Sequence, residues 1–305
     1  MPMARRRLLA AVTGGVLAGC AAPPRTTGAP GGPGGPGTPG ASGPSGAGAV
    51  PSAADHGRAG VSAQASRPPA TATRAEVVAR YGTATPTSWG FEAPGVVSRL
   101  PSTDRVVALT FDACGGPGGS GYDQALIGFL RERSVPATLF LNSRWIDANL
   151  ATFHQLAADP LFEIANHGTR HLPLSVSGRS AYGIPGTRDA GEVFDEIAGN
   201  RDKLTALLGR PPRFFRPGTA YCDDVAARIV ADLGERIAGF TVNGDAGATF
   251  TAAQVRQEVS AVQPGSIIIC HMNRPTGGTA AGIAAAVPQL LDAGHRFVRL
   301  SDLVG

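Results

Sequence analysis

The sequence predicts an α/β fold in which parallel strands form a barrel. Short apolar runs, typical of strands that are buried on both faces, alternate along the chain with amphipathic helical patterns. Polar residues follow the ends of several runs, as they do where an active site is built at the carboxyl edge of such a sheet. The runs cover residues 106–111, 137–141, 162–165, 214–215, 237–242, 267–270 and 297–300.

Amphipathic patterns between these runs predict the connecting helices. A helix over 193–208 carries its apolar residues on one stripe and ends at Gly209, a residue type that favours the left-handed conformation found after helices. Asp223 and Asp224 are able to cap a second helix, which Gly234 ends. The other two predicted helices lie around 126–130 and 283–291.

Residues 1–20 predict an export signal. Arginines at 5–7 precede an apolar stretch, 8–16, that is too short to span a bilayer. The sequence at 17–20 resembles the lipobox of bacterial lipoproteins, which implies cleavage before Cys20 and attachment of lipid to its thiol. We therefore expect an exported protein that is lipid-anchored to the outer face of the cell membrane. An ordinary secretory signal is the alternative.

A tether and a single domain follow the signal. Residues 21–72 are rich in Gly, Pro, Ala, Ser and Thr and contain almost no large apolar side chains, so we expect them to be disordered. Residues 73–305 are long enough for one large core and form the predicted catalytic domain. Loss of the three signal arginines reduces the net charge from +4 to about +1, which gives no indication of nucleic-acid binding.

Five polar residues near the run ends form the candidate site. His167 and His171 have a spacing common among metal ligands, in a chain with only six histidines. Asp112, Arg216 and His271 follow the ends of three other runs. Together these residue types predict a metal-dependent hydrolase.

Amide hydrolysis needs an activated water, an electrophile and an acid for the leaving amine. A divalent metal on the two histidines would polarise the carbonyl group and lower the pKa of a bound water, and His271 would protonate the departing nitrogen. Arg216 would orient Asp112 and keep it ionised. Asp245 is the carboxylate that we expect beside His271, although an Asp next to glycine is also a common turn residue. Each of the others also has a structural alternative, such as a capping carboxylate or a hydrogen-bonded histidine.

Four motifs, taken in order, resemble the polysaccharide deacetylases with a NodB homology domain, which form carbohydrate esterase family 4. They are Thr110-Phe111-Asp112, the His167 and His171 pair, Phe215-Arg216-Pro217 and the run before His271. The resemblance covers about 104–303. It implies a distorted (β/α)7 barrel that removes N-acetyl groups from amino-sugar polymers with a divalent metal, most often zinc. It also implies that Asp112 is the general base.

Ala113 departs from the commoner family pattern, which has a second Asp here as a metal ligand. Three alternatives could replace this ligand: Asp112 could contact the metal directly, Asp123 could bind it, or an additional water could complete its coordination. The chain also resembles a NodB-like subgroup with Asp-x-Cys, Gly-Tyr-Asp and a later cysteine. In this sequence these features correspond to Cys114, Asp123 and Cys222.

Three cysteines remain besides Cys20. Cys114 and Cys222 both follow run ends at the expected site face, in an oxidising compartment, so we predict a disulfide between them. The competing hypothesis is that Cys114 ligates the metal in place of the missing Asp, and a cysteine nucleophile is a third option. Cys270 lies inside an apolar run and is expected to be a buried thiol.

The sequence thus predicts a hydrolase of carbon–nitrogen bonds other than peptide bonds. We expect it to deacetylate an N-acetylated glycan, peptidoglycan or a chitin-like polymer, outside the cytoplasmic membrane. The expected partners are this glycan and, through the lipid on Cys20, the membrane. One alternative is an amidase of the same fold that acts on a small amide or cyclic imide. The other is a catalytically degenerate barrel that only binds glycan.

Overall fold

The structure is a computed structural model that describes residues 71–305 of the chain. The predicted signal, its Cys20 and all but the last two residues of the predicted tether lie outside the described residues. The first helix, α1 (Arg74–Tyr81), begins directly after Thr73, whose side chain accepts a hydrogen bond from the Glu76 backbone N–H. Glu76 returns the contact to the Thr73 backbone, so a capping box fixes the start of this helix.

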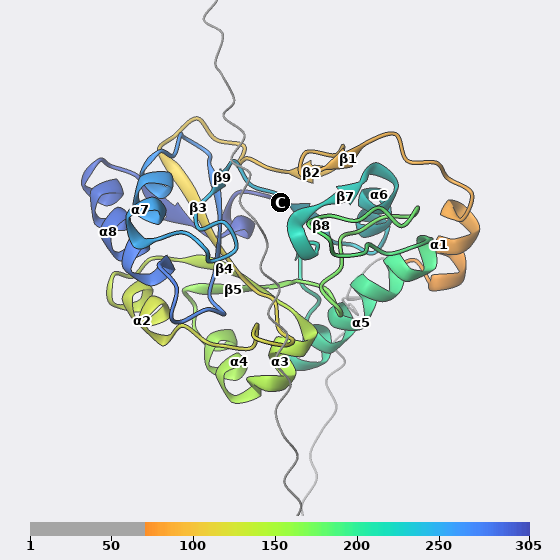
Figure 1. Cartoon of the computed structure of the whole chain (residues 1–305), viewed down its shortest axis with the longest axis horizontal. Helices are drawn as coiled ribbons and strands as arrows, with labels where there is room; N and C mark the ends of the chain where they lie inside the picture. The colour runs from red at the N-terminus through yellow and green to blue at the C-terminus, as the bar shows by residue number, and fades with distance from the viewer. Residues whose placement is uncertain (1–70) are drawn as a thin grey trace, which may run out of the picture. The chain divides into compact units, whose positions relative to one another are not determined.

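A curled parallel sheet forms the centre of the described residues (Figure 1). Every neighbouring pair of its strands is parallel, which confirms the predicted parallel α/β architecture. The first half of β3 (Val106–Ala113) pairs with β11 (Arg296–Val298), and its second half pairs with β4 (Ala137–Leu141). The main order is β2 (Val96–Val97), β8 (Arg236–Ala238), β6 (Phe214–Phe215), β5 (Phe162–Asn166), β4 (Ala137–Leu141), β3 (Val106–Ala113), β10 (Ile267–His271) and β9 (Val242–Asn243).

The predicted run 237–242 is not one strand. It is divided into β8 and β9, which lie toward opposite ends of the strand order and pair with different neighbours. Between them the backbone N–H of Gly239 donates to the Val97 carbonyl, and that of Thr241 donates to the Ile267 carbonyl. The chain therefore crosses from one end of the sheet to the other here, and the barrel is distorted rather than regular.

The alternation of side chains along β3 separates two cores. All its residues are buried, and Leu109 and Phe111 pack in the larger hydrophobic core together with side chains from the helices. Val106 and Ala108 pack in a second core, with residues of β4 and β6, inside the curled sheet. Since successive strand residues point to opposite faces, Asp112 continues the inner row. A polar group therefore enters the barrel interior at the carboxyl end of this strand.

Helices surround the sheet, and the structure confirms the helix predicted over 193–208 and the one predicted after Asp223 (Figure 1). The helix predicted over 193–208 is α5, and Gly209 follows it with a left-handed φ of 70°. Asp223 caps α6 through a hydrogen bond from the Ala226 backbone N–H. The remaining bounds are α2 (Gln124–Glu132), α3 (Ser143–Ala148), α4 (Leu150–Ala157), α5 (Ala190–Leu208), α6 (Asp224–Asp232), α7 (Ala252–Ser260) and α8 (Thr279–Asp292). Among the described residues, no helix combines the length and the apolar character that crossing a membrane requires.

The segment before β3 is fastened to the carboxyl edge of the sheet. Its strand β1 (Trp89–Gly90) pairs antiparallel with β7 (Cys222–Asp223). The backbone N–H groups of Thr87 and Ser88 donate to the Asp224 carboxylate at 2.7 and 3.0 Å. This attachment holds residues 88–93 beside the candidate site, where the sequence alone gave them no position.

Candidate metal centre

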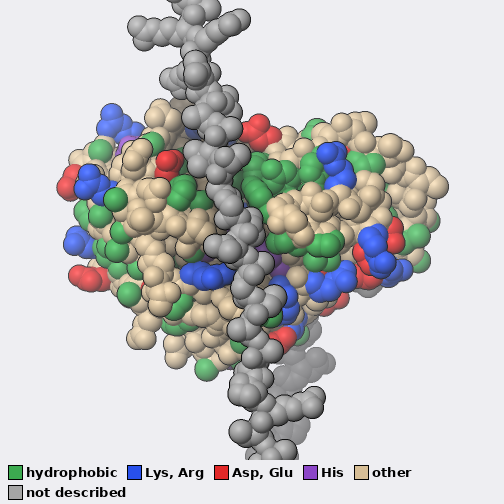
Figure 2. Space-filling model, in the orientation of Figure 1, with side chains coloured by type: hydrophobic (Ala, Val, Ile, Leu, Met, Phe, Trp, Pro, Cys, Tyr) green, Lys and Arg blue, Asp and Glu red, His purple; other side chains and the backbone are tan. Residues whose placement is uncertain are grey.

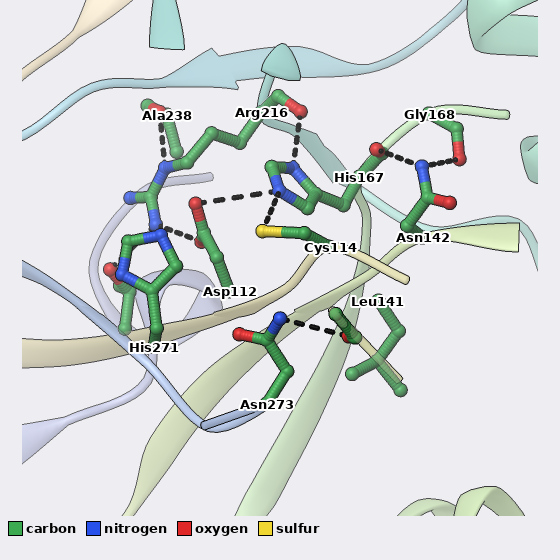
Figure 3. Close-up of polar contacts among 12 residues, drawn as sticks. Asp112, Cys114, Leu141, Asn142, His167, Gly168, Arg216, Ala238, His271 and Asn273 are labelled. Atoms are coloured by element: carbon green, nitrogen blue, oxygen red, sulfur yellow. Dashed lines mark hydrogen bonds and ion pairs between the residues drawn. The ribbon is translucent and has the colours of Figure 1, made fainter. Parts of the chain in front are cut away.

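The parallel strands deliver the candidate residues to one place, as their positions at the run ends predict (Figure 3). Asp112 lies near the end of β3 and His271 at the end of β10, where these two residues are register partners. His167 directly follows β5, and Arg216 directly follows β6. Because these strands are parallel, their carboxyl ends bring the four side chains together.

Three side chains form a group that could hold a metal ion. Cys114, His167 and His171 each offer one ligand atom, and these atoms lie within 4.8 Å of one another. The Sγ of Cys114 is 3.9 Å from Nε2 of His167. The imidazole rings of the two histidines meet edge to face, with centroids 4.7 Å apart. A thiolate and two imidazoles are donors typical of a catalytic zinc site, which has three protein ligands and one open position.

The hydrogen bond of His167 leaves the correct nitrogen free for a metal. Its Nδ1 is 2.8 Å from the carbonyl oxygen of Arg216. A carbonyl only accepts hydrogen bonds, so Nδ1 carries a proton, and Nε2 is the nitrogen that the neutral ring can offer to a metal. Nε2 faces both Cys114 and the Oδ2 of Asp112, at 3.9 and 3.6 Å. In metal sites, a carbonyl or carboxylate group commonly accepts a hydrogen bond from the second nitrogen of a ligating histidine and fixes its tautomer in this way.

A buried carboxylate shapes the loop that carries the histidine pair. Glu196, on α5, is fully buried, and its carboxylate accepts hydrogen bonds from the backbone N–H groups of Arg170 and Leu172. Gly168 has a φ of +77°, and a Cβ there would lie 2.4 Å from Oε1 of Glu196. His171 itself has a φ of 65°, which is unusual for a residue with a side chain. The loop therefore holds an uncommon backbone path that presents His171 to the site.

Arg216 and Asp112 form a buried ion pair. Nη1 of Arg216 donates to Oδ1 of Asp112 at 2.7 Å, and both side chains are almost completely buried. The guanidinium also donates to Thr110 Oγ1 and to the carbonyl groups of Ala238 and Gly239. Burial alone would raise the pKa of Asp112, but the positive charge of Arg216, with smaller effects of the nearby histidines, lowers it below its usual value. Asp112 is therefore an ionised carboxylate with Oδ2 outside the ion pair.

Asp245 lies against His271, as we expected. Its Oδ1 is 2.9 Å from Nδ1 of His271, and its Oδ2 accepts from the His271 backbone N–H at 2.7 Å. Thr279 Oγ1 donates to the same Oδ2. Burial alone would lower the pKa of His271, but hydrogen bonds to Asp245 and Cys114 raise it well above its usual value. Nδ1 faces Asp245, which leaves Nε2 available on the other side of the ring.

The predicted disulfide between Cys114 and Cys222 is contradicted, because both thiols are free. Cys114 points to His167, whereas the Sγ of Cys222 lies 4.0 Å from the Gly90 carbonyl and is buried in the core around α6. The backbone pairing of Cys222 with Gly90 fixes it there. Cys270 is a buried free thiol, as predicted.

Asp123 does not join the metal-binding group. It caps α2, with Oδ1 accepting a hydrogen bond from the Leu126 backbone N–H at 2.9 Å. Ala113 points into the larger hydrophobic core with Phe111, so its side chain lies on the face of β3 opposite to Asp112. Cys114, rather than Asp123, lies in the group with His167 and His171 that could hold a metal ion. Burial disfavours the thiolate, but His171, His167 and His271 lower the pKa of Cys114 well below its usual value.

A cavity of about 320 Å³ gives access to these groups. Asp112, His171 and His271 line one part of it, and aromatic side chains line another. Thr219 also lines the cavity, with a φ of 66° and a buried hydroxyl that has no hydrogen-bond partner among the described residues. An unpaired hydroxyl in a strained backbone at a cavity wall is a feature typical of ligand contact. Sequence reasoning did not find Thr219.

Comparisons with known proteins identify similar sequences and a similar fold. A family model for polysaccharide deacetylases matches residues 99–238. An uncharacterised protein of Streptomyces coelicolor is 31% identical over 209 residues, which are 67% of this chain and 73% of that protein. A peptidoglycan-N-acetylglucosamine deacetylase of Bacillus cereus is 24% identical over 70% of this chain and 95% of its own length. The crystal structure of a CE4 family pseudoenzyme from Bacillus anthracis matches with a TM-score of 0.59 at 22% identity, covering 70% of each chain, and so has a similar fold.

Proposed function

Because the chain belongs to the polysaccharide deacetylase family of hydrolases, we propose that it removes N-acetyl groups from an amino-sugar polymer with the help of a divalent metal. The observation that carries this proposal is one cavity that contains both an ionised Asp112 and His271, beside the group of Cys114, His167 and His171. A base, an acid and a set of metal ligands are the three requirements of amide hydrolysis at a metal site.

The ligand set fits a soft or borderline metal. The pKa of Cys114 is lowered well below its usual value, and Nδ1 of His167 donates a hydrogen bond to the Arg216 carbonyl, so Nε2 is the nitrogen directed toward the ligand group. Thiolate and imidazole donors favour zinc over magnesium or calcium, which prefer oxygen ligands. Zinc held by these residues would polarise the acetyl carbonyl and acidify a bound water.

The protein residues would move two protons. Oδ2 of Asp112 accepts a proton from the attacking water as the bond from water oxygen to carbonyl carbon forms, while Arg216 holds Oδ1 in place. Nε2 of His271 donates its proton to the sugar nitrogen as the carbon–nitrogen bond breaks, and Asp245 stabilises the charged imidazole. The products are acetate and a free amine on the sugar.

Acetate release and metal content test this proposal together. Purified protein covering residues 73–305 is incubated with N-acetylchitopentaose and, separately, with peptidoglycan, while bound metal is measured by elemental analysis. We expect about one metal per chain and release of acetate. Asp112→Asn should reduce turnover by about 10²- to 10⁴-fold, the usual contribution of a general base.

The Asp112→Asn protein should retain its circular dichroism spectrum and its metal, because Asp112 lies outside the ligand group. Metal without acetate from either glycan would contradict deacetylation and favour a small amide or cyclic imide as substrate. Glycan binding with neither metal nor acetate would identify a degenerate barrel.

We further propose that this domain acts outside the cytoplasmic membrane, anchored by lipid on Cys20. The lipobox-like sequence at 17–20 supports this location. Cells that express the full chain are fed a labelled fatty acid, and membranes are separated from the medium. Label on the wild-type protein but not on Cys20→Ser is the expected result, whereas label on both proteins would refute lipidation at this residue.

A further inference from the structure

Three buried amides lie at the start of the loop that carries His167 and His171. The side chains of Asn142, Asn166 and Asn200 are completely buried. They come from three parts of the chain, since Asn166 is the last residue of β5, Asn142 directly follows β4 and Asn200 lies in α5. A buried amide lowers stability unless its polar atoms find partners, so the contacts of these groups indicate what they do.

The amide of Asn166 is held in one orientation. Its Nδ2 donates to the Ile197 carbonyl and to Oε2 of Glu235, each at 3.1 Å. Its Oδ1 accepts from the Gly168 backbone N–H at 2.9 Å and from Nδ2 of Asn200 at 2.8 Å. A carbonyl group only accepts and a backbone N–H only donates, so the two ends of the amide cannot be exchanged. All four hydrogen-bonding positions of this side chain are therefore used.

The backbone of Gly168 is held on both sides by these amides (Figure 3). Its N–H donates to Asn166, while its carbonyl oxygen accepts from Nδ2 of Asn142 at 2.8 Å and from the Ser143 backbone N–H at 3.0 Å. The same Nδ2 of Asn142 donates to the His167 carbonyl at 2.9 Å. Side-chain amides therefore set the direction in which the chain leaves His167.

Glu235 completes this network as an uncharged acid. Acidic side chains usually lie at the surface, as on the face in Figure 2, where several adjoin Lys or Arg. Glu235 is instead 2% exposed, and Arg201, whose positive charge acts on it, forms its ion pair with Asp202. Burial raises the pKa of Glu235 well above its usual value, and the hydrogen bond from Asn166 opposes this only in part. The contact between the two side chains is therefore a hydrogen bond to a neutral carboxyl group.

The network is not arranged for stability alone. Oδ1 of Asn200 and Oε1 of Glu235 are buried and have no hydrogen-bond partner among the described residues. Unpaired buried oxygens cost stability, and apolar side chains of similar size would fill this space without that cost. What the polar groups provide, and apolar side chains could not, is a set of directed contacts that reaches the backbone of Gly168. Directed contacts of this kind specify one backbone position.

One helix supports both ends of the histidine loop. Glu196 binds the backbone N–H groups of Arg170 and Leu172. Asn200 lies one turn further along α5, and it binds Asn166. Residues four apart lie on the same helix face, so the beginning and the end of the loop are held by the same face of α5.

We propose that Asn166, Glu235 and Asn200 are positioning residues for metal binding. They act through the loop backbone and keep His167 and His171 at the separation that a single ion requires. This inference rests on the proposed function, because it takes the two histidines as ligands. It adds that a network of uncharged groups, none of which lines the cavity beside the candidate ligands, sets part of the metal affinity.

The test measures metal affinity and stability separately in the full chain. Asn166→Asp replaces one NH2 group by an oxygen, which then faces the Ile197 carbonyl and Glu235 without a proton to donate. Zinc affinity is measured by competition with a chromogenic chelator. The free energy of unfolding is measured in urea without metal, so that a loss of stability is not mistaken for a loss of affinity.

Thr138→Val is the matched control. Thr138 is also completely buried, and its hydroxyl donates to Oε2 of Glu163 at 2.9 Å and accepts from the Leu300 backbone N–H at 3.0 Å. The substitution removes both hydrogen bonds at nearly constant volume, near the amino ends of β4 and β5. It should lower the free energy of unfolding and leave zinc affinity unchanged, because the affinity belongs to the folded state.

We expect Asn166→Asp to weaken zinc binding about 10- to 100-fold, the usual range when a residue that supports a metal ligand is lost. The visible absorption of bound cobalt, which depends on ligand geometry, should also change at saturating cobalt. Glu235→Gln can offer an NH2 group to the new carboxylate, so the double variant should recover part of the lost affinity. Glu235→Gln alone completes this double-variant cycle.

Asn200→Ala provides a second test that does not depend on the folding of Asn166→Asp. It removes one of the four hydrogen bonds of Asn166 and leaves those to Ile197, Glu235 and Gly168. Zinc affinity should fall about 10-fold, the lower end of the same range.

Unchanged zinc affinity in folded Asn166→Asp and Asn200→Ala, with zinc bound by the wild type, would overturn the positioning role and leave the proposed function intact. An equal loss of affinity in Thr138→Val would also overturn it, since the effect would then come from general destabilisation. Absence of zinc binding in the wild type would remove the proposed metal-dependent function, and the positioning role with it.

Discussion

The Sγ of Cys114 lies 3.9 Å from Nε2 of His167, the ring nitrogen that does not face the Arg216 carbonyl. The position one residue earlier, where the commoner family pattern has a ligand, is Ala113, and its side chain is buried in the hydrophobic core. Cys114, the next residue on the inner side of the sheet, is therefore the candidate for the third donor.

Removal of the Cys114 thiol should weaken metal binding strongly. Cys114→Ser should reduce zinc affinity by more than about 100-fold. Loss of a residue that only hydrogen-bonds a metal ligand already reduces affinity by up to about that factor, and loss of a ligand should cost more. Cys114→Asp should recover part of the affinity, because a carboxylate is also a zinc ligand. Elemental analysis measures the metal, and cobalt substitution gives a second readout independent of activity. A sulfur-to-cobalt charge-transfer absorption should be present in the wild type and absent in Cys114→Ser; its absence in the wild type would rule out sulfur ligation.

Asp245 should control the alkaline limb of the pH profile. Burial lowers the pKa of His271, and hydrogen bonds to Asp245 and Cys114 outweigh this and raise it. The acid form of His271 is lost as the pH rises through this pKa, so activity should fall there. Without the carboxylate in Asp245→Asn, the pKa falls and the loss of kcat/KM should begin at a lower pH. An alkaline limb at the same pH in both proteins would exclude His271 as the acid.

Gly168→Ala should destabilise the histidine loop. Gly168 and Gly178 both have a φ of +77°, but an added Cβ meets Oε1 of Glu196 at 2.4 Å only at position 168. Gly178→Ala is therefore the matched control, and its cost should be about 1–2 kcal/mol, the penalty of a left-handed alanine. Gly168→Ala should cost clearly more, measured as the free energy of unfolding in urea, and it should also lower metal content. Equal losses of stability would show that the contact with Glu196 has no energetic effect.

The three cysteines in the described residues should all be free thiols. Alkylation of domain 73–305, unfolded without reductant after purification under air-free conditions, should label three groups. In the folded, metal-loaded domain, Cys114 should be protected and should become reactive after a chelator removes the metal, because a coordinated thiolate is a poor nucleophile. Labelling of only one group in the unfolded domain would restore the disulfide hypothesis.

Most of the strands could be predicted because they are fully buried and therefore read as continuous apolar runs. The division of the run at 237–242 could not be predicted, because its composition does not reveal that the backbone N–H groups of Gly239 and Thr241 donate to two different strands. The helices α3 and α4 are short and adjacent, and no pattern of sufficient length marked them.

The meeting of Asp112, His167, Arg216 and His271 could be predicted because parallel strands share a carboxyl edge. The cysteines could not be placed, because the direction of Cys222 depends on its pairing with β1, a strand of two residues. Glu196 did carry a weak signal, since it lies between Val193 and Ile197 on the buried side of a helix, where an acidic residue needs partners. Its partners are backbone N–H groups, which no side-chain pattern indicates.

Arg216 has a consequence for how this site can change during evolution. Its side chain joins Asp112, Thr110, Ala238 and Gly239, and its carbonyl group sets the tautomer of His167. Any replacement of the side chain removes the ion pair with Asp112 and the hydrogen bonds to Thr110, Ala238 and Gly239 together, whereas the backbone carbonyl that faces His167 remains. Among the described residues, the Cys114 side chain has a hydrogen-bonding contact with His167, so this candidate metal donor is more readily exchanged than the arginine.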